Sequence, residues 1–264
     1  MILDLRHRRA RIAWQAALII VAIPFAFPLY SMLQISFSGQ GAVTNYSVVL
    51  SEPGLGNFFI SSIAIALIAV VVSYICTLLA GFAFARLRVP GRNLVFSLIL
   101  FALTLPTVSL TVPLFVMVTH LGLFDSYFAV ALPVAALGIP LDLLVARDFI
   151  SNLPDAVFEA AELDGCGVFR TFLHIVVPLT RPLAGVIVVL TFLAAWNEYL
   201  LALLFLQSPD KQPITLLPQF FVSQLGTDQT KVVASSVVIA VPIIIVYLCA
   251  QRFVERGLTA GAVK

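Results

Sequence analysis

Residues 159–178 read EAAELDGCGVFRTFLHIVVP and connect two strongly apolar segments. Glu159, Glu162 and Asp164 lie within six residues of one another, although only 11% of the whole chain is charged. Charged side chains are almost never buried without partners, so this stretch is expected in water or against another protein. It is therefore a polar connection within an otherwise apolar chain.

The composition of the chain is that of a membrane protein. Its 264 residues are 61% hydrophobic, and the mean hydropathy is +1.08. Soluble domains are about 45–50% apolar and about 25% charged, so most of this chain is expected to be surrounded by lipid. The net charge of +2 is too small to indicate nucleic-acid binding. The composition thus predicts a multi-pass protein of the plasma or inner membrane.

Six segments are long and apolar enough to cross the ~30 Å hydrocarbon layer as helices. They are 12–35, 58–84, 94–119, 127–147, 183–206 and 233–251. Backbone groups exposed to lipid have no partner, so helices are expected rather than open strands. The first segment exceeds the 7–15 residues of a signal-peptide core and is expected to be retained. We therefore predict an all-α fold with a basic N-terminus at 1–11, a six-helix transmembrane domain at 12–251 and a C-terminal tail at 252–264.

Lysine and arginine are distributed unevenly among the connections, and this bias sets the orientation of a membrane protein. The links 36–57, 120–126 and 207–232 contain only Lys211 and Lys231. The other thirteen of the 15 basic residues are Arg6, Arg8, Arg9, Arg11, Arg86, Arg88, Arg92, Arg147, Arg170, Arg181, Arg252, Arg256 and Lys264. We expect both termini and the polar connection on the cytoplasmic side.

The polar connection, residues 148–182, is expected to contain a short helix at 154–164. Ser151 and Asn152 are residue types that cap helix N-termini. Gly165 is placed to end the helix in a left-handed conformation. A second short helix is expected at about 167–175, along the bilayer interface.

Ala156, Ala160 and Leu163 share one face of the first predicted helix, because they are separated by four and three residues. Ala160 and Ala161, side by side, leave a flat surface that another protein could approach closely. A solvated loop is the alternative interpretation. The length of the connection, about 35 residues, favours a docking role, since loops this long are usually functional.

Within this connection the residues match a known pattern. Glu159-Ala160-Ala161, Gly165, Ile175 and Val177-Pro178 follow the spacing EAA-x3-G-x9-I-x-L-P, with Val177 in place of Leu. This pattern resembles the EAA loop of ABC importer membrane subunits. Further stretches resemble the sugar-importer branch of that family, and together they cover nearly the whole chain: 57–59 (NFF), 81–92 (GFAFARLRVPGR), 105–115 (LPTVSLTVPLF), 121–127 (LGLFDSY), 196–200 (WNEYL) and 256–264 (RGLTAGAVK).

The resemblance implies a type I ABC importer permease fold in which the EAA helix is a coupling helix that docks on a cytoplasmic ATPase subunit. The residues implied in this docking are Glu159, Ala160, Ala161, Leu163, Asp164 and Gly165. The tail resembles the maltose and glycerol-3-phosphate type, although the usual final glycine is missing. It implies a second contact with the ATPase subunits through Gly257, Leu258, Thr259, Ala260 and Gly261.

The sequence contains no GxxxxGK[ST] phosphate-binding loop. ATP and Mg²⁺ are therefore expected on partner subunits, and the chain itself is expected to be non-catalytic. The resemblance implies two ATP-binding subunits, a second homologous permease subunit and an extracytoplasmic solute-binding protein. The implied substrate is a carbohydrate or a sugar-like polyol.

Two ionisable residues lie within the predicted spans, where a charge costs roughly 2.5–3.5 kcal/mol and marks a functional site by default. Asp142 is close to the cytoplasmic end of its span, which favours a place at the membrane interface. Glu198 lies mid-span beside Asn197 in WNEYL. These two residues either form hydrogen bonds between helices or line the translocation path.

Other classes of function are less well supported. A stand-alone ion-coupled carrier would use Asp142 and Glu198, but such carriers are often built from paired repeats, and none is evident. Neither paired carboxylates nor a nucleophile motif indicates an enzyme. The three cysteines, Cys76, Cys166 and Cys249, lack metal-ligand spacing. We predict no catalytic residue and no metal site.

Overall fold

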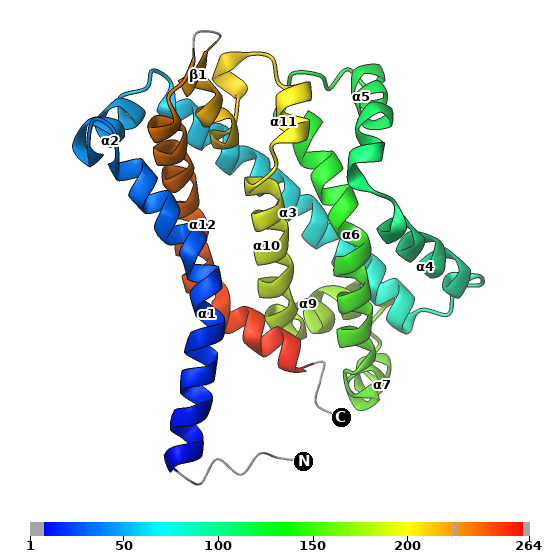
Figure 1. Ribbon diagram of the computed structural model, residues 1–264. Coiled ribbons are helices and arrows are strands. Elements are labelled where there is room, and N and C mark those ends of the chain that lie inside the picture. Colours follow the sequence, from blue (N-terminus) through cyan, green and yellow to red (C-terminus); the bar gives the residue numbers. More distant parts are fainter. Residues whose placement is uncertain (1–7, 224–225, 261–264) are drawn as a thin grey trace. The chain divides into compact units, whose positions relative to one another are not determined.

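The computed structural model describes residues 8–223 and 226–260 (Figure 1). These residues are mostly helical, and a short hairpin is formed by β1 (Val222–Ser223) and β2 (Gly226–Thr227). The predicted all-α fold is confirmed. Contacts divide the chain into two compact units, Met1–Pro53 with Leu217–Ala240 and Gly54–Leu216 with Val241–Lys264.

The smaller unit contains α1 (Arg8–Phe37), α2 (Ala42–Leu50), most of η5 (Ile214–Phe221) and the first part of α12 (Gln229–Ala260). Asn45 of α2 links the end of α1 to α12. Its Nδ2 donates to the backbone oxygens of Ser36 and Ser38, both at 2.9 Å. Thr230 Oγ1 in turn donates to Asn45 Oδ1 at 3.4 Å.

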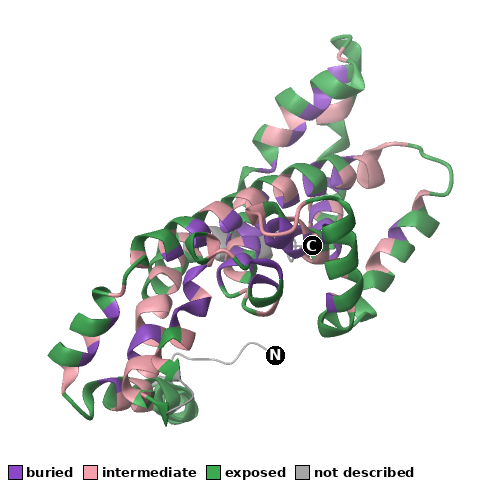
Figure 2. Cartoon of the chain, turned by 90° about the horizontal axis from the view of Figure 1, so that it is seen from above, coloured by how far each residue is buried: buried purple, intermediate pink, exposed green. Residues whose placement is uncertain are grey.

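The larger unit is built on α3 (Leu55–Arg86), α6 (Tyr127–Ser151) and α10 (Arg181–Trp196), which pack against one another (Figure 1). Small residues allow this close packing, as the sequence predicts for the second span. A Cβ on Gly81 of α3 would lie only 3.0 Å from Ala146 Cβ of α6. Figure 2 shows the burial of each residue along the chain, and the buried residues of α3, α6 and α10 form the inside of the bundle.

Shorter elements complete the larger unit. They are α4 (Arg92–Phe101), η1 (Ala102–Thr104), η2 (Thr107–Leu110), α5 (Thr111–His120), α7 (Asp155–Leu163), α8 (Val168–Thr171), the π-helical η3 (Phe172–Val176), α9 (Val177–Leu179), α11 (Leu200–Phe205) and η4 (Pro209–Lys211).

Only four of the six predicted spans are continuous helices, in α1, α3, α6 and α12. The third predicted span bends by 101° between Arg92–Thr104 and Thr107–His120. Leu105 is extended at the break, as expected for a residue before proline. The fifth predicted span, 183–206, is interrupted between α10 and α11, and α10 follows α8–α9 with a 76° bend. Counting each bent pair as one span gives six.

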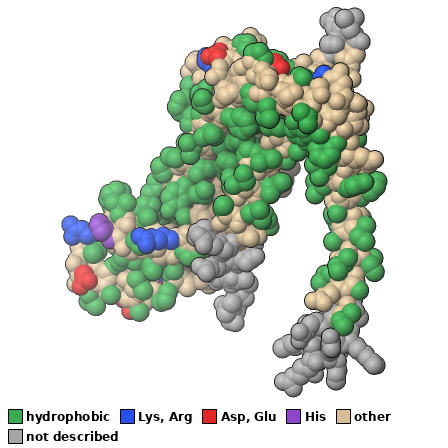
Figure 3. Space-filling view, turned by 90° about the vertical axis from the view of Figure 1, so that its left-hand side faces the viewer, with side chains coloured by type: hydrophobic (Ala, Val, Ile, Leu, Met, Phe, Trp, Pro, Cys, Tyr) green, Lys and Arg blue, Asp and Glu red, His purple; other side chains and the backbone are tan. Residues whose placement is uncertain are grey.

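The surface of the larger unit matches a lipid environment. On the face shown in Figure 3, hydrophobic side chains form a broad band and charged side chains gather toward its ends. Large apolar residues such as Leu67 and Leu98 are 59% and 61% exposed. An exposed apolar band of this extent indicates contact with lipid or with another subunit.

Candidate functional site

Helix α7 lies in the polar connection and agrees with the helix predicted at 154–164 to within one residue at each end. Gly165 ends it with a φ of +73°, the left-handed conformation. The backbone N–H of Gly165 donates to Glu162 O at 3.0 Å, and that of Cys166 donates to Ala161 O at 2.9 Å. This pair of bonds is a Schellman motif, so the predicted role of Gly165 as the stop is confirmed.

The start of α7 differs from the prediction. Ser151 is the last residue of α6, and Asn152 Nδ2 donates to Asp148 O at 2.9 Å, so both belong to the preceding helix. The N-cap of α7 is Pro154, which makes no side-chain capping bond. The expectation that Ser151 or Asn152 caps this helix was wrong, because α6 extends further than its apolar stretch.

One face of α7 is open. Ala156, Ala160 and Leu163 are exposed, and Leu163 is 89% exposed. Of the nine residues of α7 only Ala161 is buried. Ala161 was also predicted to dock but is buried, whereas the other predicted docking residues Glu159, Asp164 and Gly165 are exposed. The helix therefore presents a small apolar face with acidic residues beside it.

A cavity of about 620 Å³ lies beside α7. Its walls combine the C-terminal end of α3 with α7 and the turn that follows: Phe82, Arg86, Leu87, Arg88, Asp155, Phe158, Glu159, Glu162, Cys166, Val168 and Thr171. Both basic and acidic side chains line it. Such mixed charge suits a contact with a polar protein surface.

The turn after α7 leads back to the bundle through α8, η3 and α9, where the sequence predicts a second short helix at about 167–175. Phe172 and Val176 are buried against α3 and α6, whereas Phe169 is 69% exposed. The helix predicted here is confirmed and continues a few residues further than expected.

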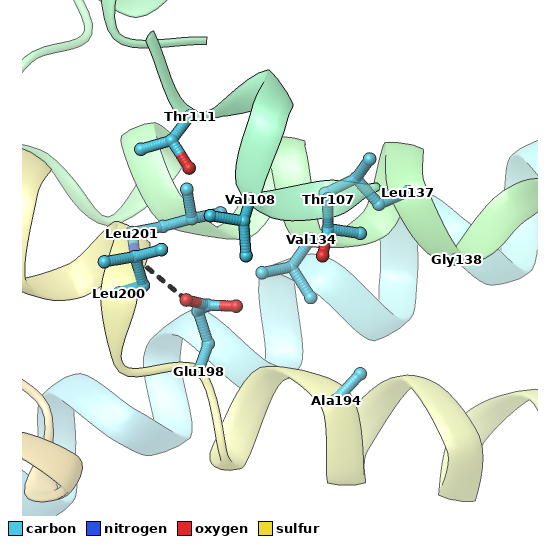
Figure 4. A pocket seen from close by; sticks show the side chains of 10 residues that line it. All are labelled: Thr107, Val108, Thr111, Val134, Leu137, Gly138, Ala194, Glu198, Leu200 and Leu201. Atoms are coloured by element: carbon cyan, nitrogen blue, oxygen red, sulfur yellow. Dashed lines mark hydrogen bonds between the residues drawn. The ribbon is translucent and has the colours of Figure 1, made fainter. Parts of the chain in front are cut away.

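Glu198 lies on the wall of a second cavity, of about 350 Å³ (Figure 4). The other lining residues come from the two broken spans and from α6: Thr107, Val108, Thr111, Val134, Leu137, Gly138, Ala194, Leu200 and Leu201. One carboxylate oxygen, Oε1, accepts a hydrogen bond from Leu201 N at 2.8 Å and so caps α11. A volume in this range is typical of small-molecule sites.

Two threonines of this cavity were not identified from the sequence. Thr107 and Thr111 belong to LPTVSLTVPLF, a stretch used only for its resemblance to the family. The Thr111 hydroxyl is buried without a hydrogen-bond partner. Asn197, predicted beside Glu198, does not line the cavity, and its Nδ2 donates to Leu193 O at 2.8 Å. The structure therefore separates the two neighbours.

Asp142 lies inside the bundle and is only 4% exposed. Its place at the level of the membrane interface stays a prediction. Its Oδ2 accepts hydrogen bonds from Ser73 Oγ of α3 at 2.8 Å and Thr191 Oγ1 of α10 at 3.3 Å. Sequence position alone does not show which helices cover a side chain, so these partners were not predicted. Asp142 joins three helices by hydrogen bonds.

The predicted tail contact lies at the edge of the described residues. The backbone of Gly257, Leu258, Thr259 and Ala260 belongs to the end of α12. Gly261 lies outside the described residues. Among the described residues no group of three or more His, Cys, Asp or Glu side chains could hold a metal ion.

Residues 77–260 match the family of binding-protein-dependent transport system inner membrane components. The sulfoquinovosyl glycerol permease SmoH of Agrobacterium fabrum is 33% identical over 86% of this chain and 80% of its own length. The maltodextrin permease MdxG of Bacillus subtilis is 29% identical over 88% and 84%. A bacterial ABC transporter that imports the acidic polysaccharide alginate superimposes with a TM-score of 0.77 at 22% identity, over 93% and 98%.

The structural similarity establishes the type I importer permease fold, and the relatives are transport permeases. A stand-alone carrier is disfavoured, because the family works with a binding protein. The chain belongs to the binding-protein-dependent transport system inner membrane components and is a multi-pass permease subunit of the plasma membrane.

Proposed function

We propose that this permease carries a carbohydrate or sugar-like polyol and that α7 is its coupling helix. The observation that carries the second part is the open face of Ala156, Ala160 and Leu163 on a helix whose end is fixed by Gly165. An exposed apolar face on a rigid helix suits a groove on a partner. The substrate class follows from relatives named for sugar compounds and from the resemblance in sequence.

The partners in this proposal are two ATP-binding subunits, a second homologous permease subunit and an extracytoplasmic binding protein. ATP and Mg²⁺ belong to the ATP-binding subunits, because this sequence has no phosphate-binding loop. The distribution of basic residues supports a cytoplasmic position for both termini and for 148–182. The tail residues 257–261 are proposed to contact the ATP-binding subunits, and a chain ending at Arg256 would test that contact by co-purification.

Gly165→Val tests the coupling role. A Cβ at Gly165 would meet nothing within 4 Å, so the change acts on the left-handed backbone rather than on packing. A left-handed β-branched residue costs on the order of 1–2 kcal/mol per residue. We expect the Schellman motif to open, and uptake and retention of the ATP-binding subunits in mild detergent to fall by about tenfold.

Gly167→Val is the matched control. Gly167 has a φ of −71° and also has open space around it, so valine fits there. The amount of permease in the membrane is measured for both variants. If both variants transport equally well, α7 is not the coupling helix.

We further propose that Glu198 lines the translocation path. A carboxylate with the Thr107 and Thr111 hydroxyls in an apolar wall can hydrogen-bond to sugar hydroxyls. Glu198→Gln keeps an acceptor for Leu201 N and should preserve the fold while raising the substrate concentration for half-maximal uptake several-fold. Asn197→Gln, on the same turn but outside the cavity, keeps an uncharged amide and is the control. An unchanged uptake curve for Glu198→Gln would remove Glu198 from the path.

A further inference from the structure

The guanidinium group of Arg86, the last residue of α3, donates several hydrogen bonds to the end of α6 and to the connection between α6 and α7. Its Nη2 donates to the backbone oxygens of Ile150 at 3.0 Å and Ser151 at 3.3 Å, and also to that of Leu153. Its Nε donates to Ile150 O at 3.2 Å. The side chain is only 17% exposed.

The same group reaches α7 itself. Nη1 of Arg86 forms an ion pair with Oδ1 of Asp155, the first residue of α7. The guanidinium carbon lies 4.2 Å from the centre of the Phe158 ring, one turn further along α7. One planar cation therefore contacts the end of α6, the connection and the start of α7.

The chemistry of these contacts suits arginine alone. The last carbonyls of a helix lack intrahelical donors and carry partial negative charge, so a cation is stabilised there. Guanidinium presents five N–H donors in a fixed plane and can stack on an aromatic ring at the same time. Lysine has a single ammonium group and could not reproduce this set of contacts.

Apart from the contacts of Arg86, helix α7 meets the bundle through Ala161 and through Phe158, which packs partly buried against the cluster around Phe82 and Ile150. Only Ala161 is buried, and Pro154 provides no side-chain cap. By contrast, α3 is the long central helix, and near Arg86 it is packed closely, with Gly81 against Ala146. A force applied to the open face of α7 therefore has a short, hydrogen-bonded route into α3 through Arg86.

We propose that Arg86 is the positioning residue that transmits displacement of α7 to the transmembrane helices. The inference rests on the proposed coupling role of α7. Arg86 touches neither nucleotide nor substrate in this role. Its removal should let α7 move without moving α3, so that ATP is hydrolysed with little transport.

The test uses the complete transporter with its ATP-binding subunits, second permease subunit and binding protein, reconstituted in liposomes. The measured quantity is the number of ATP molecules hydrolysed per substrate imported. We expect Arg86→Gln to raise this ratio about tenfold. Asp155→Asn removes only the ion pair and should raise it less. Arg86→Lys should behave like Arg86→Gln, because the planar set of donors is lost.

Arg92→Gln is the control, because the Arg92 guanidinium donates to Leu87 O at 3.0 Å, at the end of the same helix, and not to α7. It should leave the ratio unchanged. A purely structural role would lower the amount of assembled complex and leave the ratio as in the wild type, which would overturn the proposal.

If Arg86→Gln does not assemble, Asp155→Asn decides, and an unchanged ratio in that variant overturns the proposal. The Gly165→Val experiment distinguishes a failure of the Arg86 proposal from a failure of the proposed coupling role of α7. Loss of uptake in Gly165→Val with a normal ratio in the Arg86 and Asp155 variants would refute only the role of Arg86. Normal uptake in Gly165→Val would refute the coupling role of α7 itself.

Discussion

The two ends of α6 are held by opposite charges. At its N-terminal end, the Asp125 carboxylate accepts bonds from the backbone N–H groups of Gln207 at 2.9 Å and Ser208 at 3.0 Å, and from the Ser208 hydroxyl. At its C-terminal end, Arg86 donates to backbone carbonyls. Each charge has the sign that the helix dipole favours at that end.

The difference lies in what each charge holds. Asp125 fastens the start of α6 to the connection after α11, and Lys211 Nζ donates to both Asp125 O at 2.7 Å and Oδ2 at 3.1 Å. Asp125 and the residues that it contacts all belong to the larger unit. Arg86 instead fastens a helix whose outer face is open. We therefore expect a fixed anchor at the Asp125 end and a moving contact at the Arg86 end.

Asp125→Ala should give the largest change in stability, because it leaves the backbone N–H groups of Gln207 and Ser208 and the Ser208 hydroxyl without their acceptor. Hydrogen bonds to a charged group contribute about 1.5–3 kcal/mol each at most, and the contacts here are partly solvated, so we expect a loss of about 2–4 kcal/mol. Asp125 also has a φ of +55°, and a non-glycine residue needs such contacts to hold that conformation. Thermal unfolding of the purified permease in detergent measures the effect.

Asp210→Ala, an exposed position in the neighbouring turn, is the control for that measurement. Asp125→Ala should lower the unfolding temperature while the surviving transporter keeps its normal ratio of ATP to substrate. A variant that stays stable but loses coupling would show that the Asp125 end is also a moving joint.

The sequence predicted local features well. The apolar runs located the continuous spans in α1, α3, α6 and α12, because the length of a membrane helix follows from the thickness of the bilayer. The position of α7 and its stop at Gly165 followed from residue types acting on their own backbone. These predictions need only neighbours in the chain.

Contacts between distant residues were not predicted. Arg86 and its acceptors are 64 to 69 residues apart, and Asp125 and its donors 82 to 86. Both residues lie in stretches that resemble the family, GFAFARLRVPGR and LGLFDSY, but their spacing carries no information about partners. Asp125, two residues before the start of α6, was an available signal, because an anion is favoured near a helix N-terminus. The burial of Asp142 could not be foreseen, since it depends on which helices cover it.

The pH dependence of stability gives a smaller test of the same anchor. The bonds from Ser208, together with Lys211 and Gln207, hold the pKa of Asp125 well below its ordinary value of 3.8. A folded-state pKa below the unfolded one adds stability that is complete above the unfolded pKa and is lost as pH falls toward the folded value. The stability gap between wild type and Asp125→Asn should therefore be constant from about pH 7 to about pH 5 and narrow below about pH 4.

This gap is measured as the difference in unfolding temperature between the two proteins at each pH. Lys211 is 37% exposed, so solvent weakens its share, and most of the gap should come from the backbone and hydroxyl donors. Added salt should consequently change the gap little, because screening acts on exposed charges more than on hydrogen bonds. A gap that widens on acidification, or that disappears in salt, would mean that Asp125 acts as a surface charge and does not anchor α6.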